Sequence, residues 1–172
     1  ELTEGLAGLL GAQVPQSREI SANGAIVLGT PTSSPVIAGL KLDLSTSGRE
    51  GYVIRSVTIA GRRATVIAAN EDVGVLRGVF HFLRLIQTRA SLDGLSIASA
   101  PALRYRILDH WDNLDGTVER GYAGASIWDW HKLPDYIDPR YERYARACAS
   151  LGLNGAALTN VNANAVVLLP AY

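Results

Sequence analysis

The chain has 172 residues, with 16 basic and 16 acidic side chains and a hydrophobic share of 48%. This is the composition of a globular protein, and the length suffices for one domain or for one domain and the start of another. A formal net charge of zero gives no electrostatic argument for binding nucleic acid or an anionic membrane.

The single cysteine, Cys148, excludes a disulfide within the chain and a metal cluster built from cysteines. Its alanine-rich helical surroundings favour a small buried hydrophobic residue over a nucleophile. No apolar run reaches transmembrane length, and the N-terminus lacks the basic and apolar segments of a signal peptide. Because the chain begins at Glu1 rather than at Met, a cytoplasmic and a secreted location both stay open.

The first segments predict a small helix and a strand. Residues 3–11 (TEGLAGLLG) indicate a short helix with its leucines on one side and Gly11 as its end. The apolar run at 24–30 (GAIVLGT), bounded by glycines, indicates a buried strand of the kind found at the centre of a sheet.

Residues 50–69 (EGYVIRSVTIAGRRATVIAA) predict two or three strands, because β-branched and aromatic residues recur with a polar break between them. Gly61 with Arg62 and Arg63 marks the connection. We interpret the two arginines as a solvated hairpin turn rather than as a basic patch.

Residues 70–88 (NEDVGVLRGVFHFLRLIQT) give the clearest helix pattern. Asn70 is the expected N-cap, and the apolar stripe is expected to comprise Val75, Leu76, Val79, Phe80, Leu83 and Ile86. His81 is interpreted as a structural histidine. Residues 1–99 therefore predict one sheet with a long helix packed against it.

After a predicted linker at 98–101, the pattern changes to strand, loop, helix and strand. Residues 103–108 alternate apolar side chains with two arginines, which predicts a strand. Residues 138–155 predict a helix with Asp138 as its cap, Pro139 in its first position and Gly152 at its end. The expected apolar face of that helix comprises Tyr141, Tyr144, Ala145, Cys148 and Leu151.

A short buried strand is predicted at 155–160, followed by the polar run NVNAN at 160–164. A strand, a helix and a second strand in this order indicate two parallel neighbours. Ligand sites in parallel α/β sheets form at the carboxyl ends of the strands. We therefore expect Trp111 and Asn160 to lie side by side.

The loop between the first of these strands and the helix begins with HWDNLDGTVERGYAG, residues 110–124. A calcium loop does not fit, because its first and twelfth positions would be Trp111 and Tyr122 rather than acidic ligands. His110 and the nearby aspartates are too loosely spaced to favour a zinc site. Asp112 and Asp115 have a simpler interpretation as turn-forming residues.

The polar side chains of this loop, together with Trp111, match the composition of a sugar site, with a flat apolar face among hydrogen-bonding groups. Trp128 and Trp130 are expected to pack the loop down. The amides of the NVNAN run suggest a lined pocket, although turn formation also accounts for them. The residues alone thus indicate a polar, carbohydrate-type ligand.

Four segments of the chain closely resemble the α-glucuronidases of glycoside hydrolase family 67. They are HWDNLDGTVERGYAGASIWDW (110–130), EDVGVLRGVFHFLRLIQT (71–88), YARACASLGLNG (144–155) and LTNVNAN (158–164). Two departures stand out, because Asp109 replaces the usual Asn and Arg77 stands where an aromatic residue is common.

The resemblance implies an α/β fold in two parts. Residues 1–100 would form an N-terminal sheet-plus-helix domain like those that precede hexosaminidase barrels. Residues 101–172 would form the first βα units of a truncated (β/α)8 catalytic barrel, with its first strand at 103–111 and its second at 155–160.

The implied reaction is hydrolysis, with inversion, of the α-1,2 bond between (4-O-methyl)glucuronic acid and xylose in xylan-derived oligosaccharides. In that family the acid and base carboxylates come from later barrel strands, so no catalytic residue is expected within these 172 residues. No metal or cofactor is expected, and homodimerisation would use a C-terminal region beyond Tyr172.

The candidate substrate-binding residues lie on the first two loops of that barrel. Trp111 would offer an apolar face, and Asn113 would bind a hydroxyl group or brace the loop. Glu119 would accept from sugar hydroxyls, while Arg120 would hold Glu119 through an ion pair or counter the uronate. The adjacent wall would be formed by Asn160 and Asn162.

Two hypotheses follow. In the first, the chain is a portion of an α-glucuronidase that is inactive by itself. In the second, it is a non-catalytic carbohydrate-binding or interaction domain that folds alone. An unpaired second strand would leave an exposed edge, which favours the first hypothesis.

Overall fold

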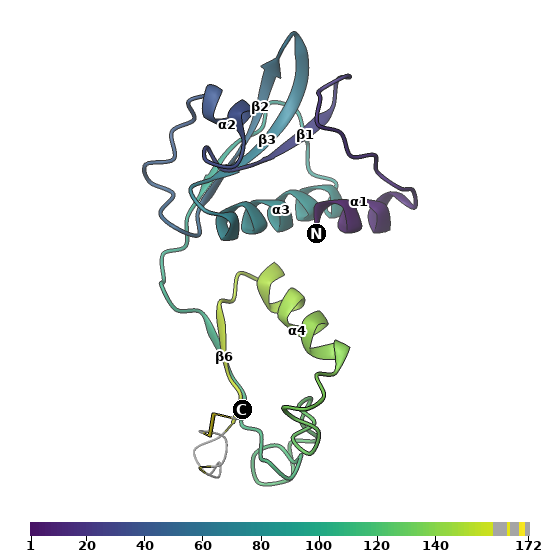
Figure 1. The fold of residues 1–172 in the computed structure, drawn as a ribbon, viewed down its shortest axis with the longest axis vertical. Coiled ribbons are helices and arrows are strands. Elements are labelled where there is room, and N and C mark those ends of the chain that lie inside the picture. Colours follow the sequence, from purple (N-terminus) through teal and green to yellow (C-terminus); the bar gives the residue numbers. More distant parts are fainter. Residues whose placement is uncertain (160–164, 166–168, 171–172) are drawn as a thin grey trace. The chain divides into compact units, whose positions relative to one another are not determined.

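The computed structural model describes residues 1–159, 165, 169 and 170. The chain divides into two compact units, residues 1–102 and residues 103–172, and each contains its own sheet (Figure 1). Within the part of the chain described, no helix is both long enough and apolar enough to span a membrane.

The first unit is a four-stranded sheet. A long helix packs against one face as predicted, whereas the short helix on the other face was not predicted. The strands lie in the order β1-β3-β2-β4; β1 is parallel to β3, whereas β2 is antiparallel to both of its neighbours. The elements in chain order are α1 (Leu2–Leu10), β1 (Ala25–Gly29), α2 (Pro35–Gly39), β2 (Tyr52–Ile59), β3 (Arg62–Ala69), α3 (Asp72–Gln87) and β4 (Ser96–Ser99).

The prediction that the strand at 24–30 lies at the centre of the sheet is wrong. β1 is an edge strand that pairs with β3 alone, and the Leu28 side chain is 44% exposed. An apolar run indicates that a strand is partly covered, but its place in the sheet depends on long-range pairing. The central strands are β2 and β3, and a hairpin connects them as predicted, with its turn at Ala60 and Gly61. Arg62 and Arg63, which were predicted in the turn, are exposed but belong to β3, where they pair with Ile59 and Thr58.

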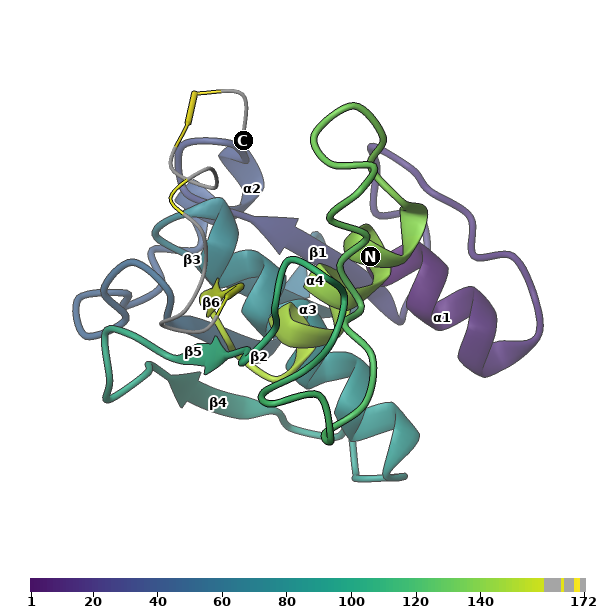
Figure 2. The ribbon, with the colours of Figure 1, turned by 90° about the horizontal axis from the view of Figure 1, so that it is seen from below.

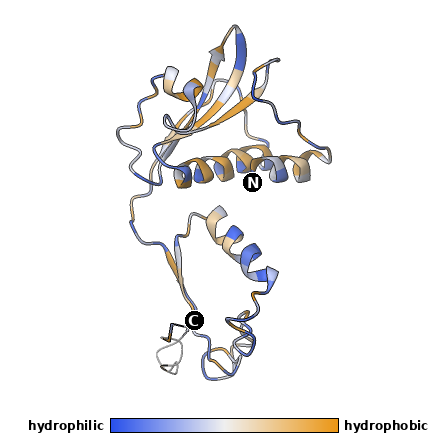
Figure 3. Ribbon diagram, in the orientation of Figure 1, coloured by the Kyte–Doolittle hydropathy of each residue, from blue (hydrophilic) through white to orange (hydrophobic). Residues whose placement is uncertain are grey.

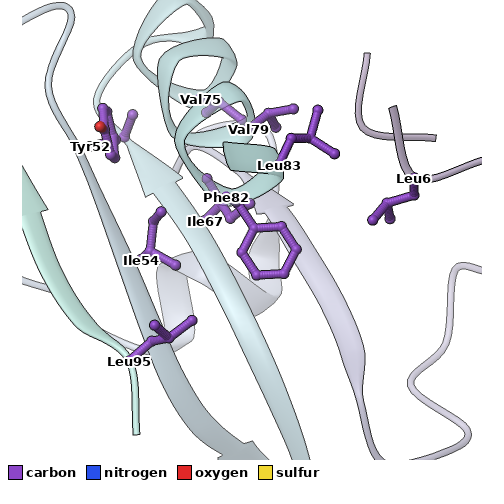
Figure 4. Close-up of a cluster of buried hydrophobic side chains, with 10 residues drawn as sticks. Leu6, Tyr52, Ile54, Ile67, Val75, Val79, Phe82, Leu83 and Leu95 are labelled. Atoms are coloured by element: carbon purple, nitrogen blue, oxygen red, sulfur yellow. The ribbon is translucent and has the colours of Figure 1, made fainter. Parts of the chain in front are cut away.

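The two faces of the sheet carry separate apolar clusters because successive side chains of a strand point to opposite sides. Ile54 and Ile67 pack beneath α3 in the larger cluster, whose side chains Figure 4 shows. Val53 and Val66 belong to the other cluster, together with Ile37 of α2. The sheet is therefore buried on both faces by neighbours in the same unit.

Helix α3 follows the predicted stripe in part, because Leu76, Phe80 and Ile86 are only half-buried. Val75, Val79 and Leu83 are buried as expected, but Phe82 is buried in place of Phe80. Two glycines let the helix approach the sheet closely: a Cβ atom on Gly78 would lie 2.5 Å from Ile67 Cγ2. Gly74 faces the backbone of Gly51 in the same way.

The predicted cap of α3 is wrong. The helix begins after Glu71, which makes no side-chain capping bond, and Asn70 lies just outside. The Asn70 amide donates instead to the carbonyl oxygens of Leu44 and Gly48, both at 3.0 Å. Asn70 therefore secures the loop before β2, a long-range role that its sequence position does not indicate.

The linker begins later than predicted. Ser99 pairs with Tyr52 at the end of β4, so residues 98 and 99 belong to the sheet and not to a linker. Short polar strands at a sheet edge lack the apolar alternation that would reveal them in a sequence.

The second unit contains β5 (Ile107–Asp109), α4 (Pro139–Ser150) and β6 (Gly155–Ala157). β5 and β6 are parallel, with Asp109 opposite Ala157, so the predicted strand–helix–strand order is confirmed (Figures 1 and 2). The Asp138 side chain caps α4 by accepting from the Arg140 N–H at 2.9 Å, also as predicted.

Three details of this unit differ from prediction. β5 spans three residues rather than six, and Leu103 and Tyr105 before it are exposed. β6 is exposed and not buried, because the described residues place no layer over this two-stranded sheet. Leu151 and Ala145, both expected on the apolar face of α4, are also exposed. Figure 3 shows that this helix is hydrophilic mainly in its first half and more apolar toward its end.

Candidate functional site

The loop that starts at residue 110 leaves the carboxyl end of β5, the edge at which parallel sheets bind ligands. The His110 N–H donates to the Ala157 carbonyl oxygen at 2.8 Å, which extends the pairing of β5 with β6 by one bond. Asn160 and Asn162 lie outside the described residues, so their predicted position beside Trp111 stays a prediction.

The loop folds back on itself as a short two-stranded ribbon. Asp112 faces Val118 across an antiparallel bridge, and the Glu119 N–H donates to the Trp111 carbonyl oxygen at 2.6 Å. Glu119 has φ of 57°, a left-handed conformation that is uncommon outside glycine. The ribbon thus brings together the backbones of two candidate binding residues, Trp111 and Glu119.

Asn113 braces this ribbon. Its amide donates to the Thr117 hydroxyl at 2.8 Å and to the Glu119 carbonyl oxygen at 2.7 Å. Of the two roles considered for Asn113, the structure displays the contacts of the bracing role, which hold Glu119 in its left-handed conformation.

Asp112 and Asp115 both serve the loop, as expected. Asp112 is 3% exposed, and its carboxylate accepts from the Ser126 hydroxyl. Asp115 accepts from the Thr117 backbone N–H at 2.9 Å and from the Thr117 hydroxyl at 2.6 Å. These two bonds, led by the hydroxyl, hold the pKa of Asp115 below its usual value, so this carboxyl group is a poor proton donor.

Trp111 is an exposed aromatic residue of the loop, as is Tyr122. The Trp111 side chain is 50% exposed, and the indole N–H donates to the Asp109 carboxylate at 3.2 Å. Asp109, the last residue of β5, therefore contacts the predicted apolar platform directly.

Glu119 has a different neighbour from the one predicted. The salt bridges among the described residues do not include a Glu119–Arg120 pair. A hydrogen bond to Glu119, with smaller contributions from burial and the carboxylate charge, raises the pKa of Tyr122. Arg120 is exposed, and the salt bridges of the described residues do not join it to Glu119.

On its other side, the loop is anchored to α4 by an aromatic cluster, which comprises His110, Trp128, Tyr141 and Tyr144. His110 Nε2 is hydrogen-bonded to the Tyr144 hydroxyl, and the two rings meet edge to face with centroids 5.3 Å apart. Trp128 packs on Tyr141 and Tyr144, with distances between ring centroids of 4.9 Å and 5.4 Å. Trp128 and Trp130 are both buried, which confirms their predicted packing role.

Burial raises the pKa of Tyr144 to about 12, with further contributions from a hydrogen bond to Cys148 and from the Asp112 charge. The phenol therefore stays protonated at neutral pH and is able to donate to an imidazole nitrogen. His110 Nδ1 faces the Asp112 carboxylate at 3.7 Å, beyond hydrogen-bonding distance.

The loop makes contacts that the sequence does not reveal. Ser126 and Tyr144 lie 14 and 34 residues from their partners, Asp112 and His110. The helical spacing did place Tyr141 and Tyr144 on one face of α4, and that is the available signal. Within the described part of the chain, no three His, Cys, Asp or Glu side chains are grouped so as to hold a metal ion.

Comparison with known proteins accounts for both units. Residues 1–82 match the N-terminus of glycosyl hydrolase family 67, and residues 85–172 match the middle domain of the same family. The chain belongs to glycosyl hydrolase family 67.

Two of the relatives that this chain matches are named as alpha-glucuronidases. Alpha-glucuronidase A of Emericella nidulans is 34% identical over 178 residues, which cover 98% of this chain and 20% of that protein. Probable alpha-glucuronidase A of Aspergillus oryzae is 33% identical over 173 residues, with the same coverage of 98% and 20%. This chain thus spans about a fifth of the length of the curated relatives that it matches.

A solved structure shares the fold at low sequence identity. It is that of a family GH138 enzyme targeting pectin rhamnogalacturonan II, which matches with a TM-score of 0.59 and 17% identity. The match covers 92% of this chain and 21% of that one. At this identity the likeness concerns the α/β fold alone.

Proposed function

We propose that this chain is the N-terminal portion of an inverting α-glucuronidase, which hydrolyses the α-1,2 bond between (4-O-methyl)glucuronic acid and xylose in xylan-derived oligosaccharides. The observation that carries the proposal is the match of both units, in order, to glycosyl hydrolase family 67. The names of the relatives support the choice of reaction.

In this proposal residues 1–100 are a hexosaminidase-like N-terminal domain, and residues 101–172 begin a (β/α)8 catalytic barrel. The parallel pairing of β5 with β6 around α4 supports a barrel start. Barrel enzymes place their active sites at the carboxyl ends of the strands. The loop at 110–126 leaves β5 at that end.

The proposed substrate-binding residues belong to two groups, one on the loop after β5 and one on the segment that follows β6. Trp111 stacks on the sugar, Glu119 accepts from its hydroxyls and Asn113 holds the ribbon that carries both. Arg120, exposed and without Glu119 as a salt-bridge partner, has its charge available to counter the uronate. The adjacent wall would be formed by Asn160 and Asn162.

The two catalytic carboxyl groups would come from the part of the protein beyond Tyr172. An inverting enzyme needs an acid and a base about 6.5–9.5 Å apart, and the acid requires a raised pKa. Asp112 is buried and bonded to Ser126, while the pKa of Asp115 is lowered. We therefore assign neither carboxyl group to the role of the general acid. Dimerisation through a C-terminal region is a further part of the proposal.

The decisive experiment measures the release of glucuronic acid from a reduced aldouronic acid by the complete gene product. Proton NMR should detect the β-anomer first, since the substrate bond is α and the proposed mechanism inverts it. Residues 1–172 alone should give no rate above a protein-free blank. Release by this short chain, or early appearance of the α-anomer, would contradict the proposal; saturable xylooligosaccharide binding by a complete protein without turnover would favour a non-catalytic binding domain.

Replacing Trp111 by Ala in the complete protein tests the site itself. We expect KM to rise about tenfold, because losing ~1.4 kcal/mol of stacking on an apolar face corresponds to that factor. Tyr136→Ala is the matched control, since Tyr136 is 49% exposed and Trp111 is 50% exposed. An equal KM change in both variants would remove Trp111 from the site.

A further inference from the structure

Three consecutive residues directly after β5 alternate between lower and higher exposure. The His110 and Asp112 side chains are 18% and 5% exposed, whereas Trp111 between them is 50% exposed. Successive side chains of an extended segment point to opposite sides. His110 and Asp112 therefore hold the backbone from within, while Trp111 is presented outward.

The two inner anchors reach different parts of the unit. Asp112 is bonded to Ser126 within the same loop. His110 is bonded to Tyr144, which lies on α4 and packs against the imidazole edge to face. Of these two bonds, the His110–Tyr144 bond joins the exposed Trp111 segment to a helix outside the loop.

We propose that His110 and Tyr144 are positioning residues for substrate binding, because their hydrogen bond fixes the backbone that presents Trp111 and, through the ribbon, Glu119. This inference rests on the proposed function, since it concerns how the sugar-binding face is held. Neither side chain is proposed as a catalytic residue, since His110 precedes the ribbon, Tyr144 lies on α4, and both act through the residues that they hold.

The ribbon carries the effect from one candidate residue to the other. The Trp111 carbonyl oxygen accepts from the Glu119 N–H at 2.6 Å, and the Asn113 amide holds the Glu119 carbonyl oxygen at 2.7 Å. A displacement of residue 110 therefore moves Trp111 and Glu119 together. Loss of the anchor should weaken binding of the ground state and the transition state alike, which raises KM and leaves kcat unchanged.

Tyr141 offers a matched control on the same helix. Its hydroxyl accepts from the Asp129 backbone N–H at 2.6 Å, and its ring packs on Trp128 at 4.9 Å. Phe at position 141 or at position 144 removes one hydroxyl from the cluster and preserves the ring. Only the change at position 144 breaks the bond to His110.

The experiment compares Tyr144→Phe with Tyr141→Phe in the complete protein. In steady-state kinetics with an aldouronic acid, we expect Tyr144→Phe to raise KM about tenfold with kcat within about twofold, and Tyr141→Phe to change neither by more than about twofold. Thermal unfolding of both variants measures the structural loss, which should be similar. Hydrogen exchange of the peptide covering residues 110–119 should quicken in Tyr144→Phe alone.

These measurements distinguish failure of the positioning role from failure of the proposed function. An active wild type whose KM does not change in Tyr144→Phe overturns the positioning role and leaves the proposed function intact. A wild type without turnover overturns the proposed function, and the hydrogen-exchange difference then decides whether Tyr144 holds the segment. Equal exchange in both variants overturns the positioning role, as does a kcat loss that matches the loss of thermal stability.

Discussion

His81 shows how one polar side chain is accommodated at the edge of the main core. Its Nδ1 atom is hydrogen-bonded to the Tyr52 hydroxyl at 2.7 Å, and the two rings meet edge to face. Burial, and to a smaller extent the charge of Arg84, lowers the pKa of this imidazole below its usual 6.5. The folded state therefore favours neutral His81.

This shift predicts a pH dependence of stability for the first unit. As the pH falls through 6.5, the unfolded chain binds a proton at His81 before the folded chain does, so the free energy of unfolding should fall. The loss continues until the pH reaches the lower folded-state pKa. Thermal unfolding between pH 7.5 and pH 5 should show this decline in the wild type and a smaller one in His81→Gln.

The other two histidines, His110 and His131, are present in the wild type and in His81→Gln. Their contributions to the pH dependence of stability therefore cancel when the two proteins are compared. Asp43 and Asp115 have pKa values below 3.8, because both carboxylates accept hydrogen bonds, and their stabilisation is lost at lower pH. Parallel stability curves for the wild type and His81→Gln would show that His81 is not the cause.

At the scale of elements, the close contact between α3 and the sheet depends on glycine residues, which have no side chain. Gly78 lies over Ile67 and Tyr52 with no room for a Cβ atom, whereas Gly8 in α1 has no atom within 4 Å of that position. Two helical glycines of the same unit thus have opposite environments. Helix propensity alone would favour alanine at both positions.

We expect Gly78→Ala and Gly8→Ala to change stability in opposite directions. Gly78→Ala should lower the free energy of unfolding by about 1–3 kcal/mol, because the added methyl group would lie 2.5 Å from Ile67 Cγ2 and force the helix outward. Gly8→Ala should raise it by about 0.5–1 kcal/mol through reduced backbone entropy of the unfolded chain. Urea unfolding measures both, and a stabilised Gly78→Ala variant would refute the close-contact argument.

At the scale of the whole molecule, the buried apolar side chains are divided unequally. Both apolar clusters belong entirely to the unit formed by residues 1–102. In the second unit, the buried residues of the described part are Asp112, Trp128 and Trp130. The first unit therefore holds a core that does not depend on the second.

Expression of the two units separately tests this division. Residues 1–102 should show a cooperative thermal transition by circular dichroism, because burial of apolar area supplies most of the stabilisation of a small domain. Residues 103–172 should show no cooperative transition, since α4 buries none of its residues. The intact 172-residue chain serves as the reference, and a cooperative transition of residues 103–172 would contradict the expectation.

Local signals in the sequence were enough for several elements of the fold. Asp138 and Pro139 start α4 as predicted, and the hairpin after β2 turns at Ala60 and Gly61. These features depend on hydrogen bonds and dihedral preferences within a few residues. The edge position of β1 was not predictable in this way, because it depends on the pairing of residues 25–29 with residues 64–68.

The candidate site shows the same difference between local contacts, which the sequence predicts, and long-range contacts, which it does not. The turn-forming role of Asp115 follows from its own neighbours, since its carboxylate binds Thr117 two residues later. The bond between His110 and Tyr144 spans 34 residues, and composition and periodicity carry no information about such a pair. The sequence alone established α1, α3 and α4, the parallel pair of β5 and β6, and the resemblance to family 67. The tertiary structure decided which side chains of the loop face inward as anchors, because that depends on contacts formed only when distant segments pack together.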